Sequence, residues 1–508
     1  MARYKPVDRN PRLLPVVLAE QIQPGSFEFA LDHLVDHELD LEALDARFHN
    51  DETGASAYDP RVMLKIVLLA YSRGIVSSRG IESACLHNVQ FIALSGDAQP
   101  SYTHIAKFVR ELSEQIKPLF TQVLLTCDRL GLIGRQMFAI DGVKLPANAS
   151  KERSGTHAEL LHRAQRLDKA ADKIIALHRS QDSKGEQDHD LDTRHQARID
   201  ELRREARATR DFVARAPKRS NRKGQELKTN ITDPDSAKMA TSKGVIQGYA
   251  AQAAVDSAHQ IIVAADVSGS GSEQAMLLAM VKQSGTLRND QTLITADAGY
   301  HSNDNLHALR QGHIPALIAD NQMRRRDERF KGQGKYKTQP DPLYDKRGRG
   351  QAAKIGLYRP ADFVYDADTN TCLCPAGQRL YSNGANCKVN GRIHHKFTGN
   401  QASCVPCQQR HQCLRHPERT KVRQVAIFAK NQPGSHQATE LMKRAIDSPR
   451  GRQLYSQRIG TVEPVFGNLR HNKRLNRFTL RGKAKVNTQW QLYCLVHNIE
   501  KLAHQGYC

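Results

Sequence analysis

The 508-residue chain has few cysteines, no long apolar run and a shortage of acidic side chains, and each shortage excludes a class of protein. Its most apolar stretch, residues 120–134, is interrupted by Asp128 and Arg129, so no run approaches the ~18 apolar residues of a membrane span. The basic first residues are not followed by the apolar segment of a secretory leader. Ten cysteines are too few for a disulfide scaffold of this length, and six fall between Cys372 and Cys413, which indicates a local metal site. We therefore expect a cytoplasmic protein with no membrane partner.

The shortage of acidic residues leaves a strongly basic chain. Lys and Arg number 75 against 53 Asp and Glu, which gives a formal net charge of +22. An excess of this size favours a polyanionic partner, and nucleic acid is the first candidate. The hydrophobic fraction of 39% is sufficient for a real core, and the length predicts two to four domains.

Residues 1–130 predict a set of short helices. Asp59-Pro60 has the form of an N-cap and first turn, and Ser77-Ser78 begins a second helix after a break. Short helices joined by tight turns suit a DNA-reading helix-turn-helix unit, but a helical bundle used for dimerisation fits equally well.

After this segment the pattern changes to short apolar runs of the kind that form strands. The expected strands are residues 137–141, 245–255, 261–267 and 293–297. The two middle runs predict a β-hairpin, because a short polar turn separates them. Helices are expected at residues 274–281 and from a Ser302 cap to Leu309. Strands followed by helices indicate the α/β class.

Two insertions interrupt this α/β region. Residues 151–228 predict an antiparallel helical hairpin, because apolar residues recur at steps of three and four on both sides of a polar stretch. Its tail, which includes Arg222 and Lys223, is a basic linker. The second insertion opens with a basic, Gly-rich stretch from Met323 to Arg349 that we expect to order on DNA.

Two carboxylates follow apolar strands at matching places. Asp141 and Asp297 each end a predicted strand, and Gly142 and Gly299 remove bulk beside them. Strand ends of an α/β sheet point side chains into a crevice where ligands bind. Two such acids with a third can hold two Mg²⁺ ions ~3.5–4 Å apart for in-line attack on a phosphodiester.

The C-terminal part supplies the third acid. If residues 455–470 are helical throughout, Tyr455, Glu463 and Arg470 share one face, although Pro464 favours a helix that starts or kinks there. The basic residues that follow predict a phosphate-facing surface, with Arg470, Lys473, Arg477 and Arg481 as its principal members. The other late glutamates, including Glu440 and Glu500, are expected on the surface.

Several short segments occur together and in order along the chain. They are residues 140–150, 232–239, 248–256, 295–300, 462–467, 477–482 and 497–498. In these segments the sequence resembles the DDE transposases of bacterial insertion sequences, in the branch with a Tyr-x-x-Arg…Glu signature, and residues 58–112 resemble that family's N-terminal domain. The resemblance implies an RNase H-like catalytic domain split by two insertions, with Asp141, Asp297 and Glu463 binding Mg²⁺ or Mn²⁺. It also implies that Lys144, Asn148, Tyr455 and Arg458 contact DNA.

The resemblance implies a division of the chain as well. Residues 1–130 form an all-α DNA-binding or dimerisation domain, and residues 131–320 form the first part of the catalytic core. Residues 321–450 carry the basic loop and a small zinc-binding insertion, and residues 451–508 return to the core with the glutamate helix. The partners are double-stranded DNA, as terminal inverted repeats and as target, and a second copy of the chain in a nucleoid-associated complex.

The cysteine cluster is a zinc signal, because Zn²⁺ takes four thiolates or imidazoles in tetrahedral geometry. The expected ligands are Cys374, Cys404, Cys407 and Cys413. Competing ligands are Cys372, Cys387, His411 and His416.

Three functions are therefore weighed. The first is a DNA transposase, the second is an RNase H-like endonuclease without transposition, and the third is a non-enzymatic zinc-ribbon DNA-binding regulator. Strand-transfer products separate the first two, and loss of cleavage in Asp141→Ala with binding kept excludes the third.

Overall fold

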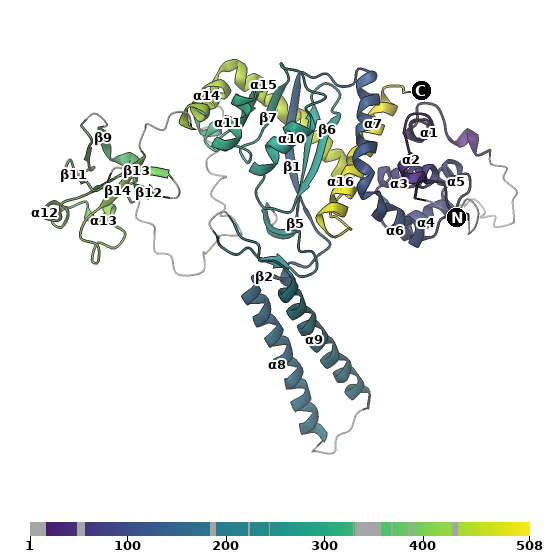
Figure 1. Ribbon diagram of the computed structural model, residues 1–508, viewed down its shortest axis with the longest axis horizontal. Helices are drawn as coiled ribbons and strands as arrows, with labels where there is room; N and C mark the ends of the chain where they lie inside the picture. The colour runs from purple at the N-terminus through teal and green to yellow at the C-terminus, as the bar shows by residue number, and fades with distance from the viewer. Residues whose placement is uncertain are drawn as a thin grey trace, which may run out of the picture. The chain divides into compact units, whose positions relative to one another are not determined.

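The computed structural model describes residues 17–47, 56–182, 189–221, 224–242, 244–328, 330, 357–366, 369–384, 387–389, 392–428 and 435–507. The chain divides into two compact units, residues 1–343 with 441–508 and residues 344–440 (Figure 1). Arg222 and Lys223 of the expected basic linker lie outside the described residues, as does most of the expected DNA-ordered loop, including residues 331–349. No described helix combines the length and the apolar character needed to cross a membrane.

The first unit is built on a mixed sheet. Its strands are β1 (Met137–Pro146), β4 (Ala237–Thr241), β5 (Gly244–Asp256), β6 (Ile262–Ser268), β7 (Leu293–Ala296) and β8 (Ala316–Ile318). The order is β4-β5-β1-β7-β8, with β6 also pairing with β5. Strand β5 runs antiparallel to β4, β6 and β1, whereas β1, β7 and β8 run parallel to one another. A short pair, β2 (Ser154–Gly155) with β3 (Thr229–Asn230), lies at the base of the helical hairpin.

The structure confirms the predicted hairpin and corrects one strand. Strands β5 and β6 pair antiparallel around a turn that follows Asp256, as the polar break in the sequence predicts. The prediction that β1 ends at Asp141 is wrong, because β1 continues to Pro146 while pairing with β5. The apolar pattern stops at Asp141, but a long partner strand keeps satisfying the backbone groups of β1 beyond that point.

Helices cover the sheet and fill the N-terminal region. Before β1 they are η1 (Ala19–Gln21), α1 (Phe27–His37), α2 (Glu42–Asp45), α3 (Pro60–Ser72), α4 (Ser78–His87), α5 (Val89–Ser95), α6 (Tyr102–Glu111), η2 (Leu112–Glu114) and α7 (Ile116–Arg129). Later come η3 (Lys151–Arg153), α8 (His157–Asp182), α9 (His189–Arg215), η4 (Gln274–Met276), α10 (Leu277–Gln283), α11 (Asn303–Gln311), η5 (Met323–Arg326), α14 (Ser435–Asp447), α15 (Pro449–Gly467), the π-helical turn η8 (Asn468–Asn472) and α16 (Lys483–His504).

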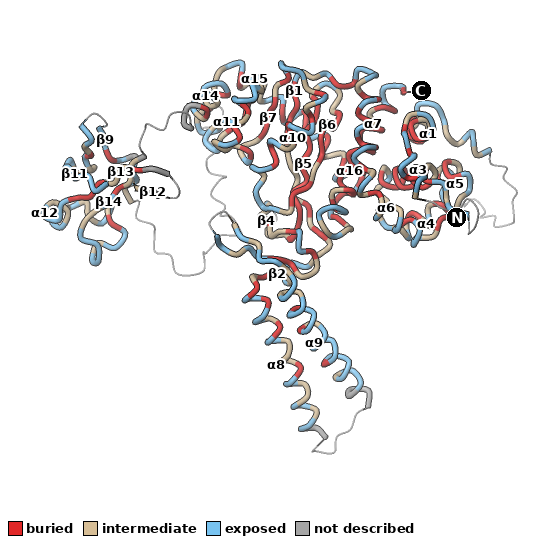
Figure 2. The backbone as a smooth tube through the Cα atoms, viewed as in Figure 1, coloured by how far each residue is buried: buried red, intermediate tan, exposed pale blue. Residues whose placement is uncertain are grey.

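Helix α16 is the centre of the core. It packs against β6 and also against α1, α3 and α7, so the N-terminal helices and the sheet share one buried helix (Figures 1 and 2). Trp490 on α16 is fully buried and its Nε1 donates to the Gln252 carbonyl at 2.9 Å, so it is a core residue.

The predicted helical hairpin is present as α8 and α9, which lie side by side (Figure 1). Ala171, Ile199 and Leu202 are buried between them, with Leu167 and Ile174 packed alongside. The two helices therefore stabilise each other through the apolar seam that the sequence shows.

Helix α15 is continuous through Pro464, so the unbroken alternative is the correct one. A proline inside a helix leaves the carbonyl four residues earlier without its partner. That carbonyl belongs to Gly460, and the Gln260 Nε2 donates to it at 3.3 Å. The missing backbone bond is thus replaced by a side chain from the β5–β6 turn.

The second unit is a small sheet with two short helices. Its elements are η7 (Pro360–Asp362), β9 (Val364–Asp366), β10 (Thr371–Leu373), β11 (Arg379–Ser382), β12 (Cys387–Val389), β13 (Arg392–Thr398), α12 (Gln401–Cys404), α13 (Arg410–Cys413) and β14 (Gln424–Phe428). Phe363, Cys372, Leu380, Phe397 and Val425 form its core. Cys372 is therefore a packing residue of this small unit.

Candidate functional site

The two aspartates singled out in the sequence lie next to each other in the sheet. The parallel pairing of β1 with β7 ends at Ile140 opposite Ala296, and the next residue of each strand is Asp141 and Asp297. Neighbouring strands are ~4.8 Å apart, so this register brings the two carboxylates to one place at the edge where β7 ends. Burial and the charge of Asp141 raise the pKa of Asp297 above its ordinary value.

Helix α15 supplies a cation and an aromatic ring to this place. The Arg458 Nη1 donates to the Asp141 Oδ2 at 2.8 Å, and the Arg458 side chain is only 11% exposed. Its guanidinium lies 5.8 Å from the centre of the Tyr455 ring, and the Tyr455 hydroxyl donates to the Ala296 carbonyl at 3.4 Å. Burial alone would lower the pKa of Arg458, but the charge and hydrogen bond of Asp141, together with Tyr455 and Asp297, keep the pKa raised.

A third acidic side chain, Glu273, lies at the same place. It precedes η4, and its Oε1 is 3.8 Å from the Nζ of Lys144 on β1. Burial raises the pKa of Glu273; the charge of Lys144 lowers it, while Asp297 and Asp141 raise it further. Glu273 is not among the residues expected from the sequence, because the third acid was expected in the C-terminal part, after Asp297. The available signal was a glutamate directly before a helix, after the Gly- and Ser-rich end of a strand.

The expected third acid, Glu463, is placed differently. It is exposed on α15, and among the described residues its side chain makes no hydrogen bond or ion pair. Arg458 and Glu463 are five residues apart, which separates them by about 140° around a helix. The structure thus brings Asp141, Asp297, Tyr455, Arg458 and Lys144 together and leaves Glu463 outside that group.

A cleft opens beside Asp297. It has a volume of about 330 Å³. Asp297, Tyr455 and Arg458 line it, together with Arg324 and Arg452. The arginines of this cleft suit the negatively charged phosphates of a nucleic-acid backbone. Asp297 lies at the end of a strand in the same cleft, where a bound phosphate could approach it.

Three of the expected DNA-contacting residues meet although they are far apart in sequence. The Arg477 Nη2 donates to the Asn148 Oδ1 at 3.2 Å, and the Arg481 Nε donates to the Asn148 carbonyl at 2.9 Å. The Asn148 Nδ2 in turn donates to the Thr479 carbonyl at 2.9 Å. Both arginines remain exposed, as does Arg470.

Lys473 is placed elsewhere. Its side chain is 1% exposed and its Nζ lies 2.7 Å from the Glu500 Oε2. The expectation that Glu500 lies on the surface is wrong, because its side chain is 28% exposed and is held by Lys473 and Asn468. The apolar pattern of α16 could not reveal a partner that arrives from η8.

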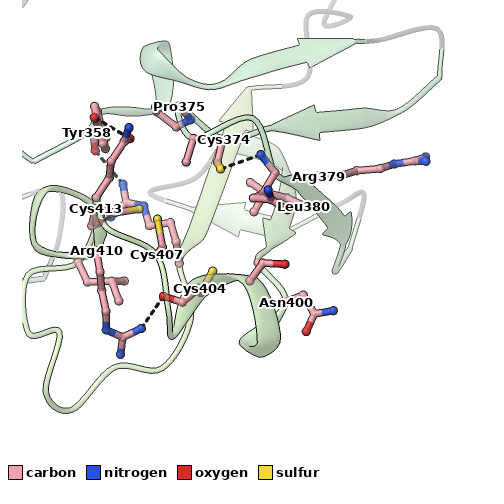
Figure 3. A pocket seen from close by; sticks show the side chains of 17 residues that line it. Tyr358, Cys374, Pro375, Arg379, Leu380, Asn400, Cys404, Cys407, Arg410 and Cys413 are labelled. Carbon is pink, nitrogen blue, oxygen red and sulfur yellow. Dashed lines mark hydrogen bonds between the residues drawn. The ribbon is translucent and has the colours of Figure 1, made fainter.

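The four expected zinc ligands gather in the second unit. Cys374, Cys404, Cys407 and Cys413 line one cavity of about 30 Å³, and Figure 3 shows their sulfur atoms around it. The Gln378 N–H donates to the Cys374 sulfur at 3.3 Å. Burial raises the pKa of the Cys413 thiol, with contributions from the other three cysteines.

None of the four competing ligands lines this cavity. Cys372 is buried in the small core, and burial raises the pKa of its thiol to about 11. His411 and His416 are exposed, and the Cys387 sulfur faces the Gly384 carbonyl.

In the described part of the chain, no group of three or more His, Cys, Asp or Glu side chains is already arranged as a metal-binding cluster. The donor sets nevertheless fit the expected ions in chemical type. The half-buried carboxylates of Asp141 and Asp297 are the hard oxygen ligands that Mg²⁺ prefers, and four thiols around a small cavity suit Zn²⁺.

Two family models match the chain. The model described as "Transposase DDE domain" matches residues 373–503, and the model described as "Transposase domain (DUF772)" matches residues 16–111. No curated protein and no solved structure matches the chain. The two matches support a DDE transposase, a DNA-binding enzyme of a class that cuts and joins DNA with divalent metals such as Mg²⁺. Neither match reaches Asp141 or Asp297, so these two residues are supported by the geometry of the sheet.

Proposed function

We propose that the protein binds the terminal inverted repeats of its own insertion sequence and catalyses metal-dependent cleavage and strand transfer of DNA. The proposed catalytic core is RNase H-like and is split by two insertions. The mixed sheet supports this fold, since three antiparallel strands, β6, β5 and β1, continue into the parallel pair β7 and β8.

The observation that carries the proposal is the position of the two aspartates. Asp141 and Asp297 follow the last paired residues of adjacent parallel strands, at the place where β7 leaves the sheet. Carboxylates side by side at this edge are suited to hold divalent cations, which would supply an activated water or 3′-hydroxyl and stabilise charge on the phosphate.

The remaining side chains orient this site and the DNA. Arg458 holds the Asp141 carboxylate through its hydrogen bond, and the Tyr455 ring lies beside the guanidinium. We assign backbone contacts to Arg470, Arg477 and Arg481, whose exposed guanidinium groups suit phosphate oxygens. On the sequence resemblance we also assign Glu463 as a metal ligand.

The division of labour along the chain is part of the proposal. Residues 1–130 recognise DNA or dimerise, residues 131–320 and 451–508 form the catalytic core, and residues 321–450 form an insertion stabilised by one Zn²⁺ on Cys374, Cys404, Cys407 and Cys413. Because two transposon ends must be paired, the active complex contains at least two copies of the chain.

The test uses the full chain, Mg²⁺ and DNA that carries the inverted repeats flanking the gene. The wild type should cleave the ends and join them to target DNA. Asp141→Ala should lose both reactions by several orders of magnitude and keep end binding, because metal-bound charge supplies several kcal/mol of barrier reduction. Glu201→Gln, an exposed change on α9, is the matched control.

The outcomes separate the three functions. Cleavage without strand-transfer products would indicate an endonuclease. Binding without any cleavage by the wild type would indicate a regulator. Glu463→Gln should abolish both reactions with end binding nearly intact, and near-normal cleavage would show that Glu463 is not a metal ligand.

A further inference from the structure

Glu273 is the acidic residue of the site that neither the sequence patterns nor the family matches assign. It comes from the segment between β6 and η4, so the site draws acids from three separate elements. Its side chain is 17% exposed. A half-buried carboxylate beside two others is unfavourable unless a cation offsets their charges.

Gly299 lies close to both Glu273 and Asp297 and so shows how near their carboxylates are to each other. A Cβ atom built on Gly299 would lie 2.7 Å from the Glu273 Oε2 and 2.9 Å from the Asp297 Oδ1. The two carboxylate oxygens therefore face one point and are no farther apart than the sum of these distances. Gly299 keeps that point open, because any larger residue would fill it.

The plain alternative is that Glu273 only forms an ion pair with Lys144. Two features argue against this as its whole role. The Lys144 Nζ is 3.8 Å from the Glu273 Oε1, which is too long for a hydrogen bond. The second oxygen, Oε2, is turned toward Asp297, where a purely structural ion pair gains nothing from a like charge.

A buried amide beside the acids gives an independent sign of a missing ligand. Gln252 pairs with Gly142 across β5 and β1, is fully buried, and its Oε1 accepts from the Tyr300 hydroxyl. Its Nε2 has no hydrogen-bond partner among the described residues. This nitrogen would lie 2.4 Å from a Cβ on Gly142, on the face of β1 that also carries Lys144, the neighbour of Glu273. An unpaired buried donor is costly and points to an acceptor that arrives with a ligand, such as an oxygen from water or phosphate.

We propose that Glu273 is a further carboxylate of the acidic site and binds a divalent cation together with Asp141 and Asp297. The inference rests on the proposed function, because that function requires the cation. Lys144 supplies the positive charge nearest to Glu273 when no cation is bound.

The experiment measures Mn²⁺ binding to the full chain without DNA, from the loss of the free Mn²⁺ signal in electron paramagnetic resonance. Glu273→Gln, which keeps the shape of the side chain, should weaken Mn²⁺ affinity at least tenfold, and Asp297→Asn should do the same. Gly299→Ala changes no charge, but its methyl group would occupy the point between the two carboxylates, so it should also weaken affinity. Glu201→Gln should bind as the wild type, and circular dichroism checks the fold of each variant.

The outcomes separate the inference from the proposed function. Wild-type affinity in Glu273→Gln with loss in Asp297→Asn would overturn the inference and leave the proposed function standing. Loss in Glu463→Gln but not in Glu273→Gln would also overturn it, in favour of the sequence-based triad. Unchanged affinity in both Asp141→Asn and Asp297→Asn would refute the metal site of the proposed function itself. If Glu273→Gln does not fold, Gly299→Ala decides, and unchanged affinity there counts against the inference.

Discussion

Replacing Glu500 by glutamine should destabilise the protein, although the sequence pattern predicts a harmless surface change. The Lys473 Nζ is 2.7 Å from the Glu500 Oε2, and the lysine side chain is 1% exposed. Burial alone would raise the pKa of Glu500, but the hydrogen bond and charge of Lys473, together with the hydrogen bond from Asn468, hold the pKa below its ordinary value. The carboxylate is therefore charged at neutral pH and offsets a buried ammonium.

The magnitude follows from what remains after each substitution. Removing one member of a buried ion pair costs ~3–5 kcal/mol, because the other charge stays buried without a partner. Glu500 is 28% exposed, so some water can reach the gap, and we expect about 2–3 kcal/mol for Glu500→Gln. Lys473→Met leaves the partly exposed carboxylate instead and should cost about 1 kcal/mol. The double variant should recover much of the loss, since it leaves no unpaired charge.

Urea unfolding followed by circular dichroism at neutral pH measures these differences, with the unfolding slopes compared to check that they are unchanged. The same variants test whether Lys473 contacts DNA phosphate, as the sequence predicts. A phosphate contact would lower the slope of log affinity against log salt by about 0.9 in Lys473→Met. The buried position predicts an unchanged slope. Stability of Glu500→Gln within about 0.5 kcal/mol of the wild type, with a reduced slope in Lys473→Met, would refute the reasoning.

Three further results are expected. One zinc per chain should be found in reduced protein. Its removal by chelation should speed hydrogen exchange in residues 357–428, because the metal stabilises a unit with little core of its own. Reduced protein that contains no zinc and whose four cavity cysteines are all alkylated would contradict this. Burial lowers the pKa of His497 to about 4, below the ~6.5 of an unfolded chain, so the unfolded state binds more protons between these values and stability should fall by up to roughly 3 kcal/mol as pH drops from 6.5 to 4. His497→Gln should flatten that pH dependence in urea titrations, and an unchanged profile would exclude His497 as its source. DNA affinity should fall steeply with salt, and Arg477→Ala should reduce the slope by about one unit, whereas a flat response of the wild type would argue against a basic footprint.

Much of the local structure could be read from the sequence, because local contacts decide it. Helix α3 begins at Pro60, as expected, because the Asp59 Oδ1 accepts the Arg61 N–H at 2.7 Å. The expected Ser302 cap is also present at the start of α11. The antiparallel hairpin of β5 and β6 follows from two apolar runs and one polar turn. These features need only neighbouring residues, so a single chain reveals them.

The site was only partly predictable. Asp141 and Asp297 could be picked out because each follows an apolar run, and the sheet then placed them in adjacent register. Glu273 could not be found in this way, because its role depends on how the segment after β6 approaches Gly299. The exposed position of Glu463 likewise depends on the rotation of α15 about its axis, which its packing against the sheet determines.

The α/β class, the helical hairpin, the four strands β1, β5, β6 and β7, the basic character and the cysteine cluster could therefore be read from the sequence alone. Only the tertiary structure decided that β1 continues past Asp141, that Lys473 and Glu500 pair in the interior, and that Glu273 joins the two aspartates. The physical reason is distance along the chain. Residues 27 apart, as in the Lys473–Glu500 pair, or more than 100 apart, as in the acidic site, meet only when separate elements pack. Local patterns carry no record of that packing.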